Sequence, residues 1–351
     1  MKMRKWIALS AVAALLMMFL PACAKKEVLN VTFFGEYISN GSDDSMNIYE
    51  EFEKKFNCKI NPSWVANNEE LYTKLSSGAM ECDVVVVSDY MIEQMITEEL
   101  LQKLDFENIP NYEYIYDDCK NLAFDKNNEY SVPYMTGTVA VIYNKTKVTD
   151  PVDSWDIFWN EKYKGDILMF RNQRDAIAVA EFKLGYSVNT TDETQIKAAM
   201  ELLKSQKPLV QAYVNDEIFD KMESGEAALG IYYAGDAVSM MENNEDLEIA
   251  FPKEGVNWFV DSLVIPKIAK NKELAEKFIN FMNEPEVAQA SAEFTYYTTP
   301  NKGAYDLLDE DFKNNPYIYP DLSKMKTETF SALPKETNRL IGNLWTELFA
   351  G

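Results

Sequence analysis

The chain has 351 residues, of which 47% are hydrophobic and 26% are charged, a composition typical of a folded globular protein. It contains no histidine, which excludes Ser-His-Asp and Cys-His nucleophilic sites and His-ligated zinc. The formal net charge of −23 argues against nucleic acid as a partner, because phosphates attract basic patches. At this length a single core usually stops growing, so we expect two lobes.

The N-terminal 22 residues have the pattern of a secretory signal. Three basic residues precede an apolar stretch over residues 6–20, which is shorter than the ~20 residues that a spanning helix needs. The Leu-Pro-Ala sequence before Cys23 resembles a bacterial lipobox, which implies cleavage before Cys23 and attachment of lipid to its sulfur. A simple secreted protein with an incidental cysteine is the alternative. Cleavage leaves a tether over residues 23–27 and changes the net charge from −23 to −26, because it removes three basic residues and no acidic ones.

Three other cysteines are present, Cys58, Cys82 and Cys119. An odd number cannot form a complete disulfide framework, and none of them lies in a CxxC pair. We expect small buried hydrophobic residues, with a single disulfide as the alternative.

The first part of the mature chain alternates between predicted strands and helices. In chain order these are a strand over 29–34, a turn and helix N-cap at 40–43, a helix with Tyr49, Phe52 and Phe56 on one face, a strand starting at Cys58, a helix over 67–77, a strand over 83–88 and a helix over 89–101. The β-branched run before Ser88 is typical of a buried parallel strand. This alternation predicts an α/β fold with a mostly parallel sheet flanked by helices.

The second part continues the same pattern. Further strands are predicted over 138–143, 167–170, 227–233 and 258–266, and helices from about 173 to Gly185, over 192–204 and over 272–282. Gly185 suits the position just after a helix, and the helices carry apolar residues on one face.

Ligands of open α/β sheets bind beyond the carboxyl ends of the strands. The residues that follow these predicted strands are rich in aromatic rings and carboxylates; they are Phe34 to Tyr37, Ser88, Asp89, Tyr90, Asn172, Asp175, Tyr233 and Asp236. Carboxylates accept charge-assisted hydrogen bonds from ammonium groups, and aromatic faces hold methylenes and attract cations. The pattern predicts a cleft for an elongated cation.

Structural roles compete with this interpretation. Ser88 and Asp236 are placed to cap helices, and Asn172 with Asp175 has the spacing of a capping box. Tyrosines at the cleft also suit packing at its rim.

Sequence motifs for nucleotide binding, calcium binding or hydrolysis are not found. The sequence has no Walker A or GxGxxG loop, no EF-hand spacing and no recognised hydrolase motif, so we expect no enzymatic activity, no cofactor and no metal. Acids and aromatic rings also suit a carboxylate-dependent glycoside hydrolase, which is the enzymatic alternative.

Seven segments, in their order and spacing, carry a resemblance to a known family. They are Gly35-Glu36-Tyr37-Ile38, Asp83 to Tyr90, Tyr130 to Tyr134, Lys183 to Thr191, Phe251 to Gly255, Val260 to Pro266 and Thr299 to Asn301. On these segments the chain resembles the spermidine/putrescine-binding proteins of bacterial ABC transporters, from about Leu29 to Leu348.

The resemblance implies a two-lobed periplasmic-binding fold of type II, with the ligand cleft between the lobes. Residues 28–136 and 259–308 would form lobe one, and residues 137–258 and 309–351 lobe two. It also implies a monomeric extracytoplasmic receptor, lipid-anchored or periplasmic. Such a receptor captures putrescine or spermidine and delivers it to an ABC permease without chemical change.

The resemblance also places the ligand-binding residues one by one. They are Phe34, Tyr37, Ser88, Tyr90, Asn172, Asp175, Tyr233, Phe259, Asp261 and Tyr297. Apart from the resemblance, Glu36, Asp89 and Asp236 are candidate accessory acids that could replace the charge missing at Asn172. Asp261 lies in an apolar run, where an unpaired acid is costly, so we expect an amine partner; a bond to hinge backbone is the alternative. Phe34, Tyr233 and Phe259 stand where the family often has tryptophan, and Asn172 where it has an acid. These departures leave open the choice between putrescine, spermidine, another cationic amine and an oligosaccharide.

Overall fold

The computed structural model describes residues 26–35 and 37–350. The predicted signal segment, Cys23 and Glu36 therefore lie outside the described residues. The strands are β1 (Val28–Phe34), β2 (Lys59–Val65), β3 (Val84–Ser88), β4 (Ser131–Asn144), β5 (Ile167–Phe170), β6 (Val210–Val214), β7 (Leu229–Tyr233), β8 (Leu247–Ala250), β9 (Val256–Val264) and β10 (Thr327–Glu328). The helices are α2 (Ile48–Phe56), α3 (Asn68–Ser76), α4 (Asp89–Thr97), α5 (Gln173–Leu184), α6 (Glu193–Gln206), α7 (Glu217–Glu223), α8 (Ala234–Asn243), α9 (Lys272–Met282), α10 (Pro285–Thr295), α11 (Lys302–Leu307), α12 (Glu310–Lys313) and α13 (Lys335–Ala350).

The strands form one curled, mixed sheet. Its order is β2-β1-β3-β9-β4-β7-β5-β6, with β8 beside β4 and β10 beside β9. Strands pair in parallel toward both ends of the sheet, as in β1 with β2 and β5 with β6. They pair antiparallel in the middle, where β9 lies between β3 and β4. The sheet thus has two halves of α/β type joined by antiparallel strands.

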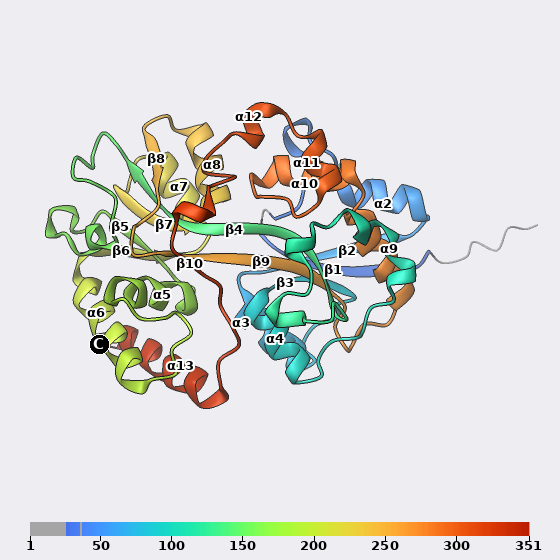
Figure 1. The fold of residues 1–351 in the computed structure, drawn as a ribbon, viewed down its shortest axis with the longest axis horizontal. Coiled ribbons are helices and arrows are strands. Elements are labelled where there is room, and N and C mark those ends of the chain that lie inside the picture. The colour runs from blue at the N-terminus through green and yellow to red at the C-terminus, as the bar shows by residue number, and fades with distance from the viewer. Residues whose placement is uncertain (1–25, 36, 351) are drawn as a thin grey trace, which may run out of the picture.

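Two long strands belong to both halves. The first part of β4, from Ser131, pairs with β9, and its second part, from Val139, pairs with β7 and β8. In the same way, β9 pairs near its start with β10 and near its end with β3. Figure 1 shows β4 and β9 side by side through the middle of the molecule. We use lobe one for the half that holds β1 to β3 and lobe two for the half that holds β5 to β7.

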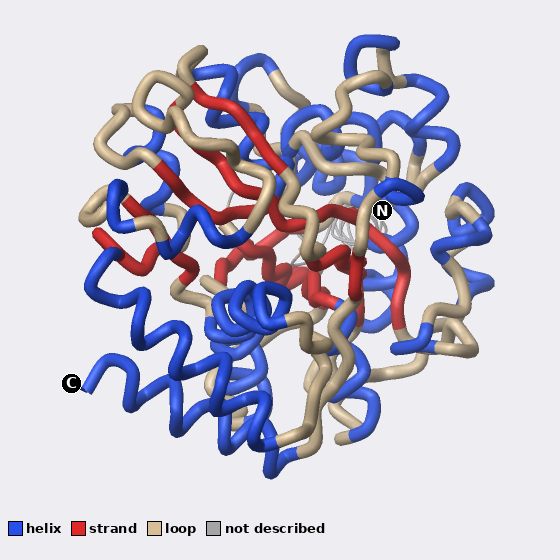
Figure 2. Tube along the Cα trace, turned by 60° about the vertical axis from the view of Figure 1, so that its left-hand side comes forward, coloured by secondary structure: helices blue, strands red, loops and turns tan. Residues whose placement is uncertain are grey.

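Helices cover the sheet on both sides. In Figure 1, α3, α4, α5, α6 and α13 lie below β4 and β9, and α7, α8, α10 and α11 lie above them. Figure 2 shows the strands in the interior and the helices around them. The amphipathic pattern that predicted α9 explains its packing, because Leu274, Phe278, Phe281 and Met282 are all buried. Phe278 meets Phe52 of α2 edge to face, with ring centroids 5.1 Å apart.

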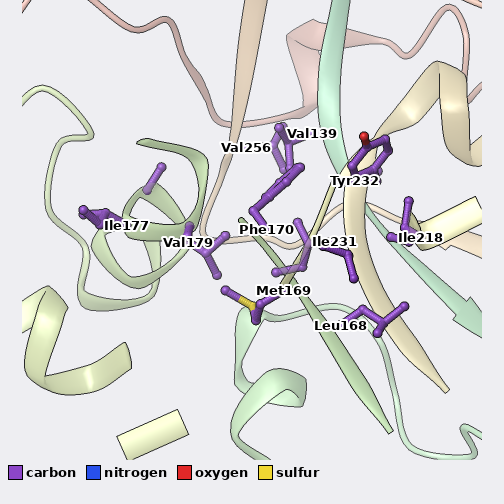
Figure 3. Close-up of a cluster of buried hydrophobic side chains, with 14 of the residues drawn as sticks. Val139, Leu168, Met169, Phe170, Ile177, Val179, Ile218, Ile231, Tyr232 and Val256 are labelled. Atoms are coloured by element: carbon purple, nitrogen blue, oxygen red, sulfur yellow. The ribbon is translucent and has the colours of Figure 1, made fainter. Parts of the chain in front are cut away.

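Two apolar clusters form the core. One lies in lobe one around β1, α2 and α9, and the other holds β5, β7, α5 and the middle of β4 in lobe two and continues into α3 and α4 of lobe one. Figure 3 shows part of this core, where Phe170 lies close to Ile231 and Tyr232. The rings of Phe170 and Tyr232 stack with centroids 5.5 Å apart. This core reaches the cleft, because both of these residues also line it.

Most predicted elements are confirmed, and several bounds are wrong. The helix predicted over 89–101 ends at Thr97. The N-cap predicted at 40–43 is a turn of 3-10 helix, and Asn47 caps α2 by accepting from Glu50 N. The run over 138–143 is the second part of a strand that begins at Ser131. Strands β6, β8 and β10 and helices α7, α10, α11, α12 and α13 were not predicted.

Candidate functional site

A cavity of about 320 Å³ lies between the two lobes. The segments after β1, β2 and β3 reach it from lobe one, and those after β5, β6 and β7 from lobe two. Strand β9 contributes Asn257, Phe259 and Asp261 from the middle of the sheet. The site is therefore where the strand ends converge, as expected for this class of sheet.

The predicted residues come together in this one cavity. Its lining includes all ten residues expected to bind the ligand: Phe34, Tyr37, Ser88, Tyr90, Asn172, Asp175, Tyr233, Phe259, Asp261 and Tyr297. The accessory acids Asp89 and Asp236 line it too. Glu36 is outside the described residues.

Other lining residues were missed. They are Ala66, Asn67, Asn68, Phe170, Asn215, Asp216, Phe219, Tyr232, Asn257 and Phe330, whereas Gly35 belongs to the expected segment after β1 and lines the cavity as well. Asn67, Asn68, Asn215 and Asp216 follow β2 and β6, so the strand-end rule finds them once those strand ends are known. Phe330 belongs to the segment between β10 and α13 and has no such signal.

Three tyrosines donate hydrogen bonds to three aspartates in the cavity. Tyr37 Oη donates to Asp261 Oδ2 at 2.8 Å. Tyr233 Oη donates to Asp175 Oδ2 at 3.1 Å, and Tyr297 Oη donates to Asp236 Oδ2 at 2.8 Å. Burial raises the pKa of each of these tyrosines well above its usual value, so the hydroxyls keep their protons and act as donors.

No basic residue of the described chain forms a salt bridge with these three carboxylates, although the nearby Arg174 acts on Asp175 through its charge. Among the described residues, no lysine or arginine lines the cavity. Burial raises the pKa of Asp261 to about 6 and that of Asp175 and Asp236 to about 7. Asp261 is 5% exposed, and its Oδ1 has no hydrogen-bond partner within the described chain. An acceptor left in this state is unfavourable, and an ammonium group in the cavity would satisfy it.

Aromatic rings form a continuous wall beside these acids. Ring centroids are 4.9 Å apart for Tyr37 and Tyr297, 6.1 Å for Tyr297 and Phe259, and 5.5 Å for Phe259 and Tyr233. Glycine makes room for this wall, because a Cβ on Gly235 would lie 2.4 Å from the Tyr297 ring. Faces of this kind hold methylene groups and attract cations.

One arginine packs against two other aromatic rings that line the cavity, Tyr90 and Phe330. Arg174 of α5 is 8% exposed, and its guanidinium lies over the rings of Tyr90 and Phe330, at 5.8 and 4.7 Å from their centroids. It donates to Asn189 Oδ1 at 2.9 Å. Tyr90 Oη in turn donates to Glu69 Oε1 at 2.8 Å. The arginine thus orders the tyrosine from outside the cavity.

The expected structural roles are partly present. Ser88 precedes α4 but makes no side-chain cap bond, and its Oγ accepts from Asn68 Nδ2 at 2.9 Å. Asn172 caps α5 by accepting from Arg174 N at 3.0 Å. Asp175 stands three residues later but its carboxylate accepts from Tyr233. The cap position expected for Asp236 is wrong, because Tyr233 precedes α8 and Asp236 lies in its first turn.

Asp89 serves the fold more than the cavity. It is fully buried, with Oδ1 accepting from Tyr90 N at 2.7 Å and Oδ2 from Val260 N at 3.2 Å. Both oxygens are therefore used by backbone groups, which tie the start of α4 to β9. Burial raises the pKa of Asp89, and these two N–H groups oppose that effect.

Metal sites, membrane-spanning helices and disulfides are not seen in the part of the chain that the structure describes. Residues 26–35 and 37–350 contain no cluster of acids and cysteines that could hold a metal ion. Their helices are too short or too polar to cross a membrane. Cys58, Cys82 and Cys119 are free thiols, of which the first two are buried and the third is partly exposed.

Comparison with known proteins decides the family. The family described as "Bacterial extracellular solute-binding protein" matches residues 47–320. The chain belongs to this solute-binding family. Its two-lobed fold and its cleft between the lobes agree with a family that binds solutes.

Relatives of this solute-binding protein have specific names. The chain is 36% identical to the spermidine/putrescine-binding periplasmic protein of Escherichia coli, over 92% of each chain. It is 31% identical to the putrescine-binding periplasmic protein SpuD of Pseudomonas aeruginosa, over 93% of each. Among solved structures, a putative spermidine/putrescine ABC transporter protein from Listeria monocytogenes superposes with a TM-score of 0.88 at 35% identity, covering 92% of this chain and 99% of that one.

Proposed function

We propose that this protein captures a polyamine, putrescine or spermidine, between its two lobes. The observation that carries the proposal is a set of carboxylates, two buried and one half-buried, in a cavity whose lining, within the described residues, has no basic side chain. Asp175, Asp236 and Asp261 would receive the ammonium groups, and the aromatic wall would hold the methylenes between them. The names of the relatives support this ligand class.

The energetics fit this assignment. Micromolar capture requires about −8 kcal/mol net. Charge-assisted hydrogen bonds contribute roughly 1.5–3 kcal/mol each. Two or three such bonds sum to roughly 3–9 kcal/mol, and cation–π contacts of roughly 0.5–2 kcal/mol each add to this sum against the cost of association.

Isothermal titration of the chain from Ala24 with putrescine and spermidine tests the proposal. We expect saturable one-to-one binding of at least one amine, and weaker binding at high salt because the contacts are ionic. A neutral oligosaccharide is the control. Absence of binding by both amines would refute the ligand class and leave the family intact.

We further propose that the protein binds its ligand without chemical change and passes it to an ABC permease. The two lobes, with residues 28–136 and 259–308 in lobe one and 137–258 and 309–351 in lobe two, would close on the ligand about β4 and β9. Mass spectrometry of ligand recovered after long incubation should show it unaltered. Light scattering should show a monomer, and small-angle scattering should show compaction when the amine is added.

A lipid anchor at Cys23 is the last part of the proposal. The sequence before this cysteine resembles a lipobox, and a lipid would hold the receptor at the membrane near its permease. Metabolic labelling with a fatty acid, compared between the natural chain and Cys23→Ser, tests it. Equal labelling of both would refute the anchor.

A further inference from the structure

Gly35 and Asp216 face each other across the cleft. Gly35 follows β1 in lobe one, Asp216 follows β6 in lobe two, and both line the cavity. A Cβ added to Gly35 would lie 2.6 Å from Asp216 Oδ2. Real Cβ atoms do not approach oxygen so closely, so a side chain at position 35 would push this carboxylate away. The glycine lets an acid from the opposite lobe come up to the main chain of lobe one.

One oxygen of Asp216 is fixed and the other faces across the cleft. Tyr232 Oη donates to Asp216 Oδ1 at 2.7 Å, and Tyr232 is itself buried and stacked on Phe170. The oxygen that faces Gly35 is Oδ2. No lysine or arginine within the described residues forms a salt bridge with Asp216. Its negative charge is thus held in place without being neutralised.

Asp216 adds a further carboxylate to the cavity lining, beyond Asp175, Asp236 and Asp261. Tyr37 and Tyr297 stand between Asp261 and Asp236, since each tyrosine bonds one of these acids and their rings are 4.9 Å apart. Asp236 lies on the side of Asp216, whose charge is one of the causes that raise the pKa of Asp236, after burial. Asp216 itself is exposed, at the end of the cavity that Asn215 and Asn67 share with a neighbouring surface pocket. The cavity therefore has buried acids at one end and the exposed Asp216 at its mouth, where Arg171 lines the neighbouring pocket but not the cavity.

We infer that Asp216 is an additional ligand-binding carboxylate, which Gly35 admits and Tyr232 orients. It would receive a second ammonium group of a linear amine whose first ammonium group lies at Asp175 and Asp261. This assignment rests on the proposed function and deepens it, because it selects ligands with positive charge at both ends.

Titration of Asp216→Asn with putrescine and spermidine is the first test. The amide keeps an acceptor for Tyr232 and removes the charge. We expect the affinity for at least one amine to fall about tenfold. A loss of this size lies between the contribution of an exposed ion pair and that of a charge-assisted hydrogen bond. Asp220→Asn is the matched control, because Asp220 is exposed on α7, the helix that directly follows Asp216, and does not line the cavity. The affinity of this control variant for both amines should stay within about twofold of the natural chain, because a distant exposed charge is screened by salt.

A double-mutant cycle tests the role of the glycine. Gly35→Ala should weaken binding in the natural chain, because the added methyl displaces Asp216. The same substitution should have little effect in an Asp216→Ala background, where nothing is left to displace. Circular dichroism and melting temperature confirm that each variant is folded.

The outcomes separate the two proposals. If the natural chain binds neither amine, the proposed function fails. If it binds an amine and Asp216→Asn binds both amines as well as Asp220→Asn does, the role of Asp216 is refuted and the proposed function stands. Equal losses from Gly35→Ala in both backgrounds would refute the role of the glycine.

Discussion

Tyr37 and Asp261 are 224 positions apart in the sequence, and the tyrosine hydroxyl donates to the aspartate Oδ2 at 2.8 Å. This bond joins the segment after β1 to the long strand β9 at the middle of the sheet. It satisfies only one carboxylate oxygen, because Oδ1 has no partner among the described residues. The pair therefore forms an ordered acceptor that is incomplete without a ligand.

Asp261→Asn should weaken polyamine binding by at least about 2 kcal/mol, or roughly 30-fold, because it removes a buried charge that faces the cavity. Stability should change little, since the amide still accepts from Tyr37. Titration calorimetry and thermal melting measure the two effects. Unchanged affinity would remove Asp261 from the binding site.

Asp83→Asn is the control for Asp261→Asn, because we expect it to lower stability and leave binding unchanged. Asp83 is 2% exposed and accepts from Asn30 N at 2.9 Å and from Lys270 N at 2.8 Å, away from the cavity. Losing one of these acceptors should lower the free energy of unfolding by about 1–3 kcal/mol. Its affinity for polyamine should stay the same, so the two buried acids separate folding from binding.

Affinity for polyamine should rise with pH between about 5 and 8. The pKa of Asp261 is about 6 and that of Asp175 about 7 in the ligand-free protein, so both are increasingly protonated as pH falls through this range. Ammonium groups bind the carboxylate form, and at about pH 8 alkyl amines still carry their charge. Binding near neutral pH should therefore release protons, which titrations in buffers of different ionisation enthalpy detect. Equal affinity at both ends of the range would contradict the assignment.

The stability of the ligand-free protein should fall as pH rises, whereas its affinity for polyamine should rise. A carboxyl group whose pKa is raised by folding contributes stability below its unfolded pKa and loses that contribution as pH rises through its folded value, about 7 for Asp175. The melting temperature should fall from about pH 5 to about pH 8, and less so in Asp175→Asn, which cannot ionise. Comparing the two proteins cancels the effect of the overall negative charge. Identical pH slopes would show that Asp175 is not the cause.

Asp89→Asn should destabilise the fold, because an amide NH₂ would replace an oxygen that accepts from Tyr90 N or Val260 N. We expect a loss of about 1–3 kcal/mol, the cost of leaving a buried donor unsatisfied. Chemical denaturation measures it. A variant as stable as the natural chain would show that these two backbone bonds contribute nothing.

The sequence was sufficient for elements with strong local signals. Helix α5 has a capping asparagine, Asn172, and ends at Gly185, whose φ of 73° suits glycine. Helix α9 has one apolar face and is confirmed over 272–282. The buried strands β3, β5 and β7 have continuous apolar runs, and because their ends were recognisable, the residues after them were found as lining residues of one cavity.

Elements with weak local signals were missed. Residues 210–213 of strand β6 are only partly buried, so no clear alternation marks it. The rule that found Ser88 and Tyr233 therefore failed to find Asp216. Phe330 reaches the cavity through the path of residues 329–334, which is set by contacts such as that between Ala332 N and Glu93 Oε2 at 2.7 Å. Contacts between distant segments of this kind leave no periodic pattern in the sequence.

The sharing of β4 and β9 between the two lobes has a consequence for unfolding. If lobe two melted alone, β4 would lose its pairing from Val139 onward and β9 would lose its pairing with β10, while the rest of both strands stayed in lobe one. Neither half can therefore come apart without fraying the central strands of the other. We expect both halves to unfold in one cooperative transition, in contrast to proteins whose domains are joined by a single flexible linker and melt in separate steps.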